Sequence, residues 1–437
     1  MSKKLHLISL GCTKNLVDSE VMLGRLRDYK IIDDPSIADV IIVNTCGFIE
    51  AAKEESINTV LNLHANRQNN SILVMSGCLT ERYKTELQEQ MPEIDIFTGV
   101  GDYEKIDSLI RTKQSTFTPE VYLANEDSNR VITGSNYHAY IKIAEGCNQQ
   151  CSFCAIPNFK GKLHSRTLIS IKKEVARLVS QGFHDFSFIS QDSSSFGKDI
   201  NLNDGLIDLI KIIETIDRIN SARILYLYPS TTTFKLIDTI SDSKVFQTYY
   251  DMPIQHIDDS VLKSMKRGFG ETKTIELLNY MKQKPNSFIR TSVIAGHPNE
   301  TDKQFNKLCN FMKDFEFDRF NTFNYSNEET TTAFNMPQID DTIINYRAEK
   351  LGEIAERSTQ SSLKKIIGKK LILIIDGESN EHEYLLSARP INWAVEIDGE
   401  ILINDTSDLD ITYGKQYSAE ITELVGIQLL ATLIKEL

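Results

Sequence analysis

In the stretch Glu145-Gly146-Cys147-Asn148-Gln149-Gln150-Cys151-Ser152-Phe153-Cys154, three cysteines lie four and three residues apart. The stretch follows an apolar run at 139–144 that is typical of a buried strand. Three thiolates this close in sequence can face one point only if the chain loops around it. Structural zinc sites usually take four ligands, often as two separated pairs, and a 4Fe–4S cluster is ordinarily held by four cysteines. Three local cysteines would therefore leave one iron of such a cluster open to a small molecule.

The CxxxCxxC spacing resembles the signature of the radical S-adenosylmethionine (SAM) superfamily, and Phe153 matches the aromatic residue before the last cysteine of that pattern. The resemblance implies that Cys147, Cys151 and Cys154 are the catalytic ligands of a 4Fe–4S cluster. Its open iron would bind the amino and carboxylate groups of SAM, and an electron from the cluster would release a 5′-deoxyadenosyl radical. A zinc site or a disulfide-bonded cluster is the alternative for these three cysteines.

The whole chain has 437 residues, which predicts about three domains, and 41% hydrophobic residues, enough for packed cores. The longest apolar runs, such as 40–43, are far shorter than the roughly 20 residues of a membrane-spanning helix. The start Met1-Ser2-Lys3-Lys4 does not have the pattern of a signal peptide. We therefore expect a soluble cytoplasmic protein with no membrane partner.

The charge and the cysteines narrow the kinds of partner. The net charge of −13 disfavours a broad nucleic-acid-binding surface, because such a surface needs a basic face. The same charge favours association with a basic protein through electrostatic steering. Six of the seven cysteines follow predicted strands, and cysteines of large cytosolic chains more often bind metal or act in catalysis than form disulfides.

Three segments of the predicted first domain, 1–115, share one design, in which an apolar run leads to a cysteine. Each run suits a strand buried on both faces, and each is followed by a helical pattern. Such alternation predicts an open parallel sheet with helices on both faces. The runs are 6–10 before Gly11-Cys12, 40–44 before Thr45-Cys46 and 72–76 before Gly77-Cys78. The helices are expected at 16–28, 49–66 and 81–90, with a further strand at 94–97 and a helix at 102–110.

Parallel strands have their carboxyl ends at one edge of the sheet, where open α/β sheets bind ligands. We therefore expect Cys12, Cys46 and Cys78 to converge, although they are over thirty residues apart in sequence. Three cysteines at the same place in three successive strand–helix units predict a second iron–sulfur cluster, again with three protein ligands. The alternative is three buried cysteines with a structural role only.

Three motifs of this region resemble the methylthiotransferase family, radical SAM enzymes that hold an auxiliary 4Fe–4S cluster in this domain. The motifs are Gly11-Cys12-Thr13-Lys14-Asn15-Leu16-Val17-Asp18-Ser19-Glu20, Asn44-Thr45-Cys46-Gly47-Phe48-Ile49 and Gly77-Cys78. The first two resemble the RimO-type branch of the family, whereas the tRNA-modifying branches usually carry other residues there. The resemblance implies two 4Fe–4S clusters and SAM as cofactors.

A polar connector at 112–136 leads to the predicted second domain, 133–365. Its six strand–helix repeats predict a partial (β/α)6 barrel, the layout typical of the radical SAM superfamily. The expected strands are 139–144, 184–190, 223–228, 246–251, 289–295 and 317–324. The expected helices are 168–181, 205–219, 231–240, 257–265, 271–284 and 301–315.

Active-site residues of such barrels lie at the carboxyl ends of the strands. Polar residues follow most of these strands, and they have close counterparts in the methylthiotransferases, where such loops surround SAM. The resemblance thus implies that SAM contacts Phe153, Arg166, Gln191, Gln255 and Gly296, with Arg166 pairing with the SAM carboxylate. For Arg166, Gln191 and Gln255 the alternative is hydrogen bonding within the barrel mouth.

Short segments separated by Asp-Gly turns predict a small β-barrel at 366–437, which resembles a TRAM domain in position and size. TRAM domains of tRNA-modifying relatives bind RNA, but this segment has thirteen Asp or Glu against five Lys or Arg, a balance of −8. Such a barrel should repel a phosphate backbone and attract a basic protein, unless its acidic surface is merely solvated. The expected strands are 371–375, 383–386, 394–397, 401–404, 416–422 and 429–434.

The resemblance covers essentially the whole chain and implies insertion of a methylthio group at the β-carbon of a specific aspartate in small-subunit ribosomal protein twelve. An unactivated C–H bond does not yield to ordinary acid–base chemistry, so a cofactor must carry that step. The cluster on Cys147, Cys151 and Cys154 would generate the radical, the second cluster would present or donate sulfur, and a second SAM would supply the methyl group. Expected partners are this basic ribosomal protein, free or within the ribosome, and an electron donor such as flavodoxin, without direct nucleic-acid binding.

The sequence leaves two alternative functions open. A tRNA adenosine methylthiotransferase would use the same chemistry, but it would need a basic terminal barrel. A non-catalytic iron–sulfur protein that binds the ribosome or transfers electrons would need neither an open iron nor polar residues around the barrel mouth.

Overall fold

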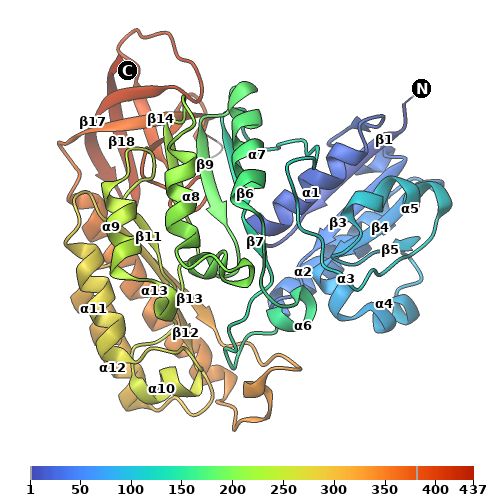
Figure 1. Cartoon of the computed structure of the whole chain (residues 1–437), viewed down its shortest axis with the longest axis horizontal. Helices are drawn as coiled ribbons and strands as arrows, with labels where there is room; N and C mark the ends of the chain where they lie inside the picture. Colours follow the sequence, from blue (N-terminus) through green and yellow to red (C-terminus); the bar gives the residue numbers. More distant parts are fainter. Residues whose placement is uncertain (1, 380–381) are drawn as a thin grey trace.

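The computed structural model of the chain describes residues 2–379 and 382–437. Figure 1 shows three parts in sequence order: an amino-terminal sheet with its helices, a larger central barrel, and a small β-barrel that carries the carboxyl terminus. This is the α/β architecture that the sequence predicts. No helix among the described residues is long and apolar enough to cross a membrane.

The amino-terminal part is a five-stranded parallel sheet in the order β2-β1-β3-β4-β5. Every residue of β3 and β4 is buried, because alternate side chains enter apolar clusters on opposite faces of the sheet. The strands are β1 Lys4–Ser9, β2 Lys30–Ile31, β3 Val40–Thr45, β4 Ile72–Gly77 and β5 Ile96–Phe97. The helices are α1 Thr13–Arg25, α2 Glu50–Asn66, α3 Cys78–Arg82, α4 Lys84–Gln90 and α5 Ile106–Thr112.

Two features of this sheet differ from the prediction. The short edge strand β2 was not expected, since its two residues are both exposed and give no apolar pattern. The single helix expected at 81–90 is interrupted at Tyr83, whose φ of −125° and ψ of 36° are not helical. The cysteine-bearing turn is therefore followed by a separate short helix, α3, which begins at Cys78 itself.

Six parallel strands form the central part, in two sheets, β6-β9-β10 and β11-β12-β13, which a bridge between Ala222 and Phe246 joins. The strand order follows the chain, and helices cover the outside (Figure 1), so the predicted partial barrel is confirmed. The strands are β6 His138–Lys142, β9 Asp185–Ile189, β10 Ser221–Ile224, β11 Tyr249–Asp251, β12 Phe288–Ala295 and β13 Arg319–Asn324. The helices around them are α7 Leu168–Ser180, α8 Gly205–Ile213, α9 Phe234–Asp242, α10 Asp259–Ser264, α11 Glu271–Lys282, α12 Asp302–Phe315 and α13 Asp341–Lys364.

The third strand ends earlier than expected, at Ile224 rather than at residue 228. Tyr226 has a φ of 63°, which lies in the left-handed region and cannot continue a strand. The chain therefore turns at Tyr226, at the carboxyl end of β10. The cluster loop itself lies between the hairpin strands β7 Ala144–Glu145 and β8 His164–Ser165, together with the short helix α6 Ile156–Lys160.

The terminal part is a closed five-stranded barrel in the order β14-β15-β16-β18-β17. The strand predicted at 394–397 is wrong, because this segment is a turn in which the Asp398 carboxylate accepts a hydrogen bond from the Ala394 amide at 2.8 Å. The second strand begins at Leu386, where the prediction had it end. The strands are β14 Lys370–Glu378, β15 Leu386–Pro390, β16 Ile401–Asp405, β17 Gln416–Val425 and β18 Gln428–Glu436.

The terminal barrel packs against the amino ends of the central strands. Asp185, at the start of β9, accepts hydrogen bonds from Arg223 of β10 and from Arg389 of β15, and all three side chains are buried. Trp393 is 4% exposed and lies against Phe288, at the start of β12. The carboxyl ends of the central strands, where a barrel binds its ligands, therefore remain on the side away from the terminal barrel.

Candidate active site

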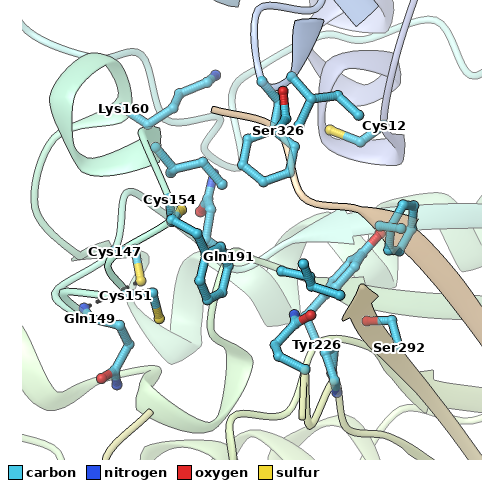
Figure 2. Close-up of a pocket in the computed structure, with 18 of the residues that line it drawn as sticks. Cys12, Cys147, Gln149, Cys151, Cys154, Lys160, Gln191, Tyr226, Ser292 and Ser326 are labelled. Atoms are coloured by element: carbon cyan, nitrogen blue, oxygen red, sulfur yellow. Dashed lines mark hydrogen bonds between the residues drawn. The ribbon is translucent and has the colours of Figure 1, made fainter. Parts of the chain in front are cut away.

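All six predicted cluster cysteines line one cavity of about 410 Å³. Three come from the amino-terminal part and three from the loop between β7 and β8. Figure 2 shows Cys12 on the opposite side of this cavity from Cys147, Cys151 and Cys154, and Gln191 and Tyr226 also line the cavity. The cysteines of each set lie at the cavity, as the sequence predicts. The two sets therefore also lie near each other.

The amino-terminal cysteines are brought together by tight turns. Cys12 precedes α1, Cys46 follows β3, and Cys78 begins α3. Gly11 has a φ of +85°, and a Cβ at this position would lie only 2.8 Å from Cys46 Sγ. Only glycine combines this backbone conformation with so close an approach of the two loops.

Asn15, on the first turn of α1, fixes these loops relative to one another. Its side-chain amide donates hydrogen bonds to the carbonyls of Leu10 and Thr45, both at 3.0 Å. Its Oδ1 accepts a hydrogen bond from Cys78 Sγ at 3.5 Å. One buried side chain therefore contacts the loops after β1, β3 and β4, a role that was not predicted from the sequence although Asn15 belongs to the first cysteine motif.

The loop of the second cysteine set is equally constrained. Gly146 has a φ of +75°, and a Cβ there would lie 2.2 Å from the carbonyl oxygen of Lys162. Cys151 Sγ accepts a hydrogen bond from Arg267 Nη1 at 3.4 Å and lies 3.5 Å from the Tyr228 hydroxyl. Arg267 was not among the predicted site residues, because its position after α10 gives no sign that it reaches the cysteine loop.

Burial keeps most of these thiols protonated when no metal is bound. It raises the pKa of Cys46 to about 11 and that of Cys78, Cys147 and Cys154 to about 12. A coordinating metal would supply the positive charge that stabilises the thiolate forms. All seven cysteines are free, so the disulfide alternative is not formed. No three His, Cys, Asp or Glu side chains in residues 2–379 and 382–437 converge closely enough for a single metal ion.

Three thiols of each set face one cavity, which is the donor chemistry of an iron–sulfur cluster. Gln191 and Gln255 also line it, and the side-chain oxygen of each is buried without a hydrogen-bond partner. A buried acceptor without a donor is costly, and a ligand with amino or hydroxyl groups would satisfy both. The cavity therefore fits a cluster and SAM together.

The five predicted SAM contacts divide into two groups. Phe153, Gln191 and Gln255 line the cavity, whereas Arg166 and Gly296 are not among its lining residues. Arg166 instead forms an ion pair with Glu174 of α7 and donates a hydrogen bond to the carbonyl of Lys142 at 3.1 Å. This is the alternative that sequence analysis left open for Arg166, hydrogen bonding within the barrel mouth. SAM contact by these residues stays a prediction.

A buried charge network joins the two parts of the chain beside the cavity. Lys142 of β6 is paired with Asp18 of α1 and with Glu145, 2.7 Å away. Lys160 lies 3.4 Å from Glu145 and 3.5 Å from Asp18. Burial favours the neutral form of Glu145, but the ammonium groups of Lys142 and Lys160 outweigh it and lower the pKa of Glu145 to about 2. The ion pairs among these four side chains fix α1 against the cluster loop.

A second charged contact lies on the loop after β13. Glu328 is buried and accepts hydrogen bonds from Arg82 at 2.7 Å and from Lys53 at 3.2 Å, both in the amino-terminal part. Asn158 of α6 donates a hydrogen bond to Thr330 Oγ1 of the same loop at 2.8 Å. The distance between the two sets of cysteines is thus held from both sides of the cavity.

Comparison with known proteins agrees with this arrangement. Family models match at 4–99, the uncharacterized protein family UPF0004, at 141–312, the radical SAM superfamily, and at 367–434, the TRAM domain. In fold, the chain is similar to a radical S-adenosylmethionine methyltransferase, TsrM, from Kitasatospora setae. That similarity has a TM-score of 0.55 at 14% identity, over 74% of this chain and 73% of the other.

Curated relatives extend over the full length of the chain. The protein of Sulfurovum sp. (strain NBC37-1) is 77% identical over 99% of both chains. The protein of Aliarcobacter butzleri is 62% identical over 99% of this chain and 98% of its own. Both carry the name ribosomal protein uS12 methylthiotransferase RimO. Identity of this extent, together with the radical SAM domain and its cavity of cysteines, shows that the chain belongs to the RimO family of radical SAM methylthiotransferases.

Proposed function

We propose that this enzyme transfers a methylthio group to the β-carbon of a specific aspartate in ribosomal protein uS12. The observation that carries the proposal is the meeting of two sets of three cysteines at one cavity. The names of the full-length relatives supply the substrate protein. As a radical SAM protein the chain uses an iron–sulfur cluster and SAM, and we propose a second cluster on Cys12, Cys46 and Cys78.

The cofactors, when bound, supply a carbon-centred radical that removes a hydrogen atom from an unactivated C–H bond, together with the sulfur and the methyl group. The chain's own residues position the reacting groups and exclude water from them. Cys147, Cys151 and Cys154 would hold the cluster that binds SAM, and Gln191 and Gln255 would donate or accept hydrogen bonds to SAM at the cavity wall. Both cysteine sets line the same cavity, with Cys12 across from Cys147, Cys151 and Cys154 (Figure 2), and a short-lived radical requires its partners to be this close.

The partners follow from the same proposal. A basic ribosomal protein, free or within the ribosome, suits a chain of net charge −13. We propose the acidic terminal barrel as a surface that favours this protein over RNA. An electron donor such as flavodoxin would reduce the cluster. A cytoplasmic location, as the sequence predicts, fits both partners.

The test is anaerobic incubation of the reconstituted enzyme with SAM, a reductant and uS12, followed by mass spectrometry of the protein and an assay for 5′-deoxyadenosine. We expect 5′-deoxyadenosine together with a methylthio group on one aspartate. Cys154→Ser should lose both products, whereas Cys78→Ser should lose the methylthio group and keep 5′-deoxyadenosine. Methylthiolated tRNA with unmodified uS12 would contradict the proposed substrate, and absence of 5′-deoxyadenosine would contradict the proposed chemistry.

A further inference from the structure

Three cationic side chains line the cavity, and they differ in their partners. Lys160 is shared by Asp18 and Glu145. Arg267 donates hydrogen bonds to the carbonyl of Pro253 at 2.5 Å and to Cys151 Sγ at 3.4 Å. Lys14 has no carboxylate within ion-pair distance in the described part of the chain, although its side chain is buried.

The contact of Lys14 crosses the boundary between the two parts of the chain. Its Nζ lies 3.6 Å from the centre of the Tyr226 ring, at the carboxyl end of β10. An aromatic face attracts an ammonium group, but it does not accept the hydrogen bonds that water would have accepted. Lys14 is therefore held in place at the cavity without an ion pair in residues 2–379 and 382–437, and Glu145 acts on its charge only from beyond ion-pair distance.

The proposed substrate has a carboxylate that could form an ion pair with Lys14. An aspartate has its β-carbon bonded directly to its carboxylate, so reaction at the β-carbon brings the carboxylate into the cavity. With an ordinary pKa of about 3.9, this group arrives as an anion. A buried anion is costly unless a cation or hydrogen-bond donors meet it.

We infer that Lys14 binds the carboxylate of the substrate aspartate and thereby makes the enzyme select aspartate over asparagine. This inference rests on the proposed function, since it takes the substrate residue from there. Lys14 is then a specificity-determining residue, which recognises a side chain that is acidic and short. The competing explanation is that Lys14 only balances the charge of the thiolates of Cys12, Cys46 and Cys78. That explanation predicts an effect on the cluster and none on the choice of substrate.

The experiment compares two synthetic peptides that carry the uS12 sequence around the modified residue, one with aspartate and one with asparagine there. Binding of each peptide to the reconstituted enzyme is measured by fluorescence anisotropy in the absence of reductant, so that no turnover occurs. The variants are Lys14→Met, which keeps length and removes charge, and Lys14→Arg, which keeps charge. Lys113→Met, at an exposed position at the end of α5, is the matched control.

We expect the unchanged enzyme to bind the aspartate peptide at least about 30-fold more tightly, the fold-change typical of losing one partner of a buried charge pair. Lys14→Met should bring the two affinities to within about threefold, whereas Lys14→Arg and Lys113→Met should retain most of the preference. Iron content is measured for every variant. If Lys14→Met binds less iron than the unchanged enzyme, Lys14→Gln is used in its place and the ratio of affinities decides in the same way.

The outcomes separate this inference from the proposed function. An enzyme that methylthiolates the aspartate peptide while its Lys14→Met variant keeps the preference for aspartate overturns the inference alone. An unchanged enzyme that binds both peptides equally also overturns it. An unchanged enzyme that binds the aspartate peptide but never modifies it contradicts the proposed function, while the ratio of affinities still tests the role of Lys14.

Discussion

Replacing Glu328 by Gln tests whether buried charge holds the amino-terminal part against the central barrel. The Glu328 side chain is 2% exposed, and its carboxylate meets Arg82 at 2.7 Å and Lys53 at 3.2 Å. Glutamine keeps the shape of the side chain but removes the negative charge that both cations face. Arg82 would then remain near the interface without a counter-charge, whereas Lys53 would keep its ion pair with Glu50 at 2.5 Å.

The magnitude follows from the burial of the three groups. Breaking a buried ion pair costs about 3–5 kcal/mol, because the partner charge stays buried without compensation. Arg82 and Lys53 are 6% and 13% exposed, so water partly solvates them. We therefore expect the free energy of unfolding to fall by about 3 kcal/mol, the low end of that range.

The pKa of Glu328 gives this prediction a pH dependence. Burial favours the neutral carboxyl group, but hydrogen bonds from Ser326 and Arg82 and the charge of Lys53 outweigh it and lower the pKa below its ordinary value. A carboxylate whose pKa is lowered by folding adds stability above its unfolded pKa of about 4.3, and this stability is lost as the pH falls through the folded pKa. The difference between the unchanged protein and Glu328→Gln should be full at neutral pH and shrink below about pH 4.

Urea denaturation at pH 7 and at about pH 3, together with hydrogen exchange of α2 and α3, measures both effects. The matched control is Glu276→Gln, which removes an exposed pair with Lys273 whose side chains are 45% and 61% exposed. Loss of such a surface pair changes stability by less than about 1 kcal/mol. Equal losses of stability for Glu328→Gln and Glu276→Gln at pH 7 would refute the reasoning.

Three further predictions follow from single contacts. Gly11→Ala should lose the iron of one of the two proposed clusters in a colorimetric assay, because the added Cβ meets Cys46 Sγ. The control is Gly182→Ala, where φ is +103° but nothing lies within 4 Å of the added Cβ, and this variant should keep all its iron. Gln191→Leu should weaken SAM binding by roughly 5-fold in calorimetry, since it removes a buried amide, whereas exposed Gln283→Leu should not. Arg389→Met should release the terminal barrel to protease more readily, because buried Asp185 loses a partner, while 5′-deoxyadenosine formation persists.

The sequence predicts those features that depend on a single segment or on the rules of parallel sheets. The runs at 40–43 and 72–75 are apolar without interruption, as expected of strands buried on both faces. Cys12, Cys46 and Cys78 could be placed together because parallel strands share one edge. The cluster loop after β6 follows from the same rule, applied to the barrel.

Contacts between parts of the chain could not be predicted in this way. Asp18 and Lys142 are 124 residues apart, and nothing near either residue indicates its partner. The ion pair of Arg166 with Glu174 of α7 was likewise not predicted, because nothing near Arg166 in the sequence indicates this partner. The segment 394–397 has the composition of a strand, but its apolar residues are buried by contact with the central barrel rather than by a ladder of hydrogen bonds. In each case the residue or segment contacts a partner in another helix or strand, and the local sequence does not identify that partner.

The helix α1 connects the interface between the two parts of the chain with the cavity. Lys14 and Asp18 are four residues apart, so they lie on the same face of α1, on its first two turns after Cys12. Asp18 pairs with Lys142 of the barrel, whereas Lys14 reaches the cavity and the Tyr226 ring. A different rotation of α1 would separate Asp18 from Lys142 and Lys160 and leave a buried carboxylate without a partner, which is costly. The pair of Asp18 and Lys142 therefore sets the rotation of α1, and with it the distance between Cys12 and the second cysteine set and the position of the Lys14 ammonium group.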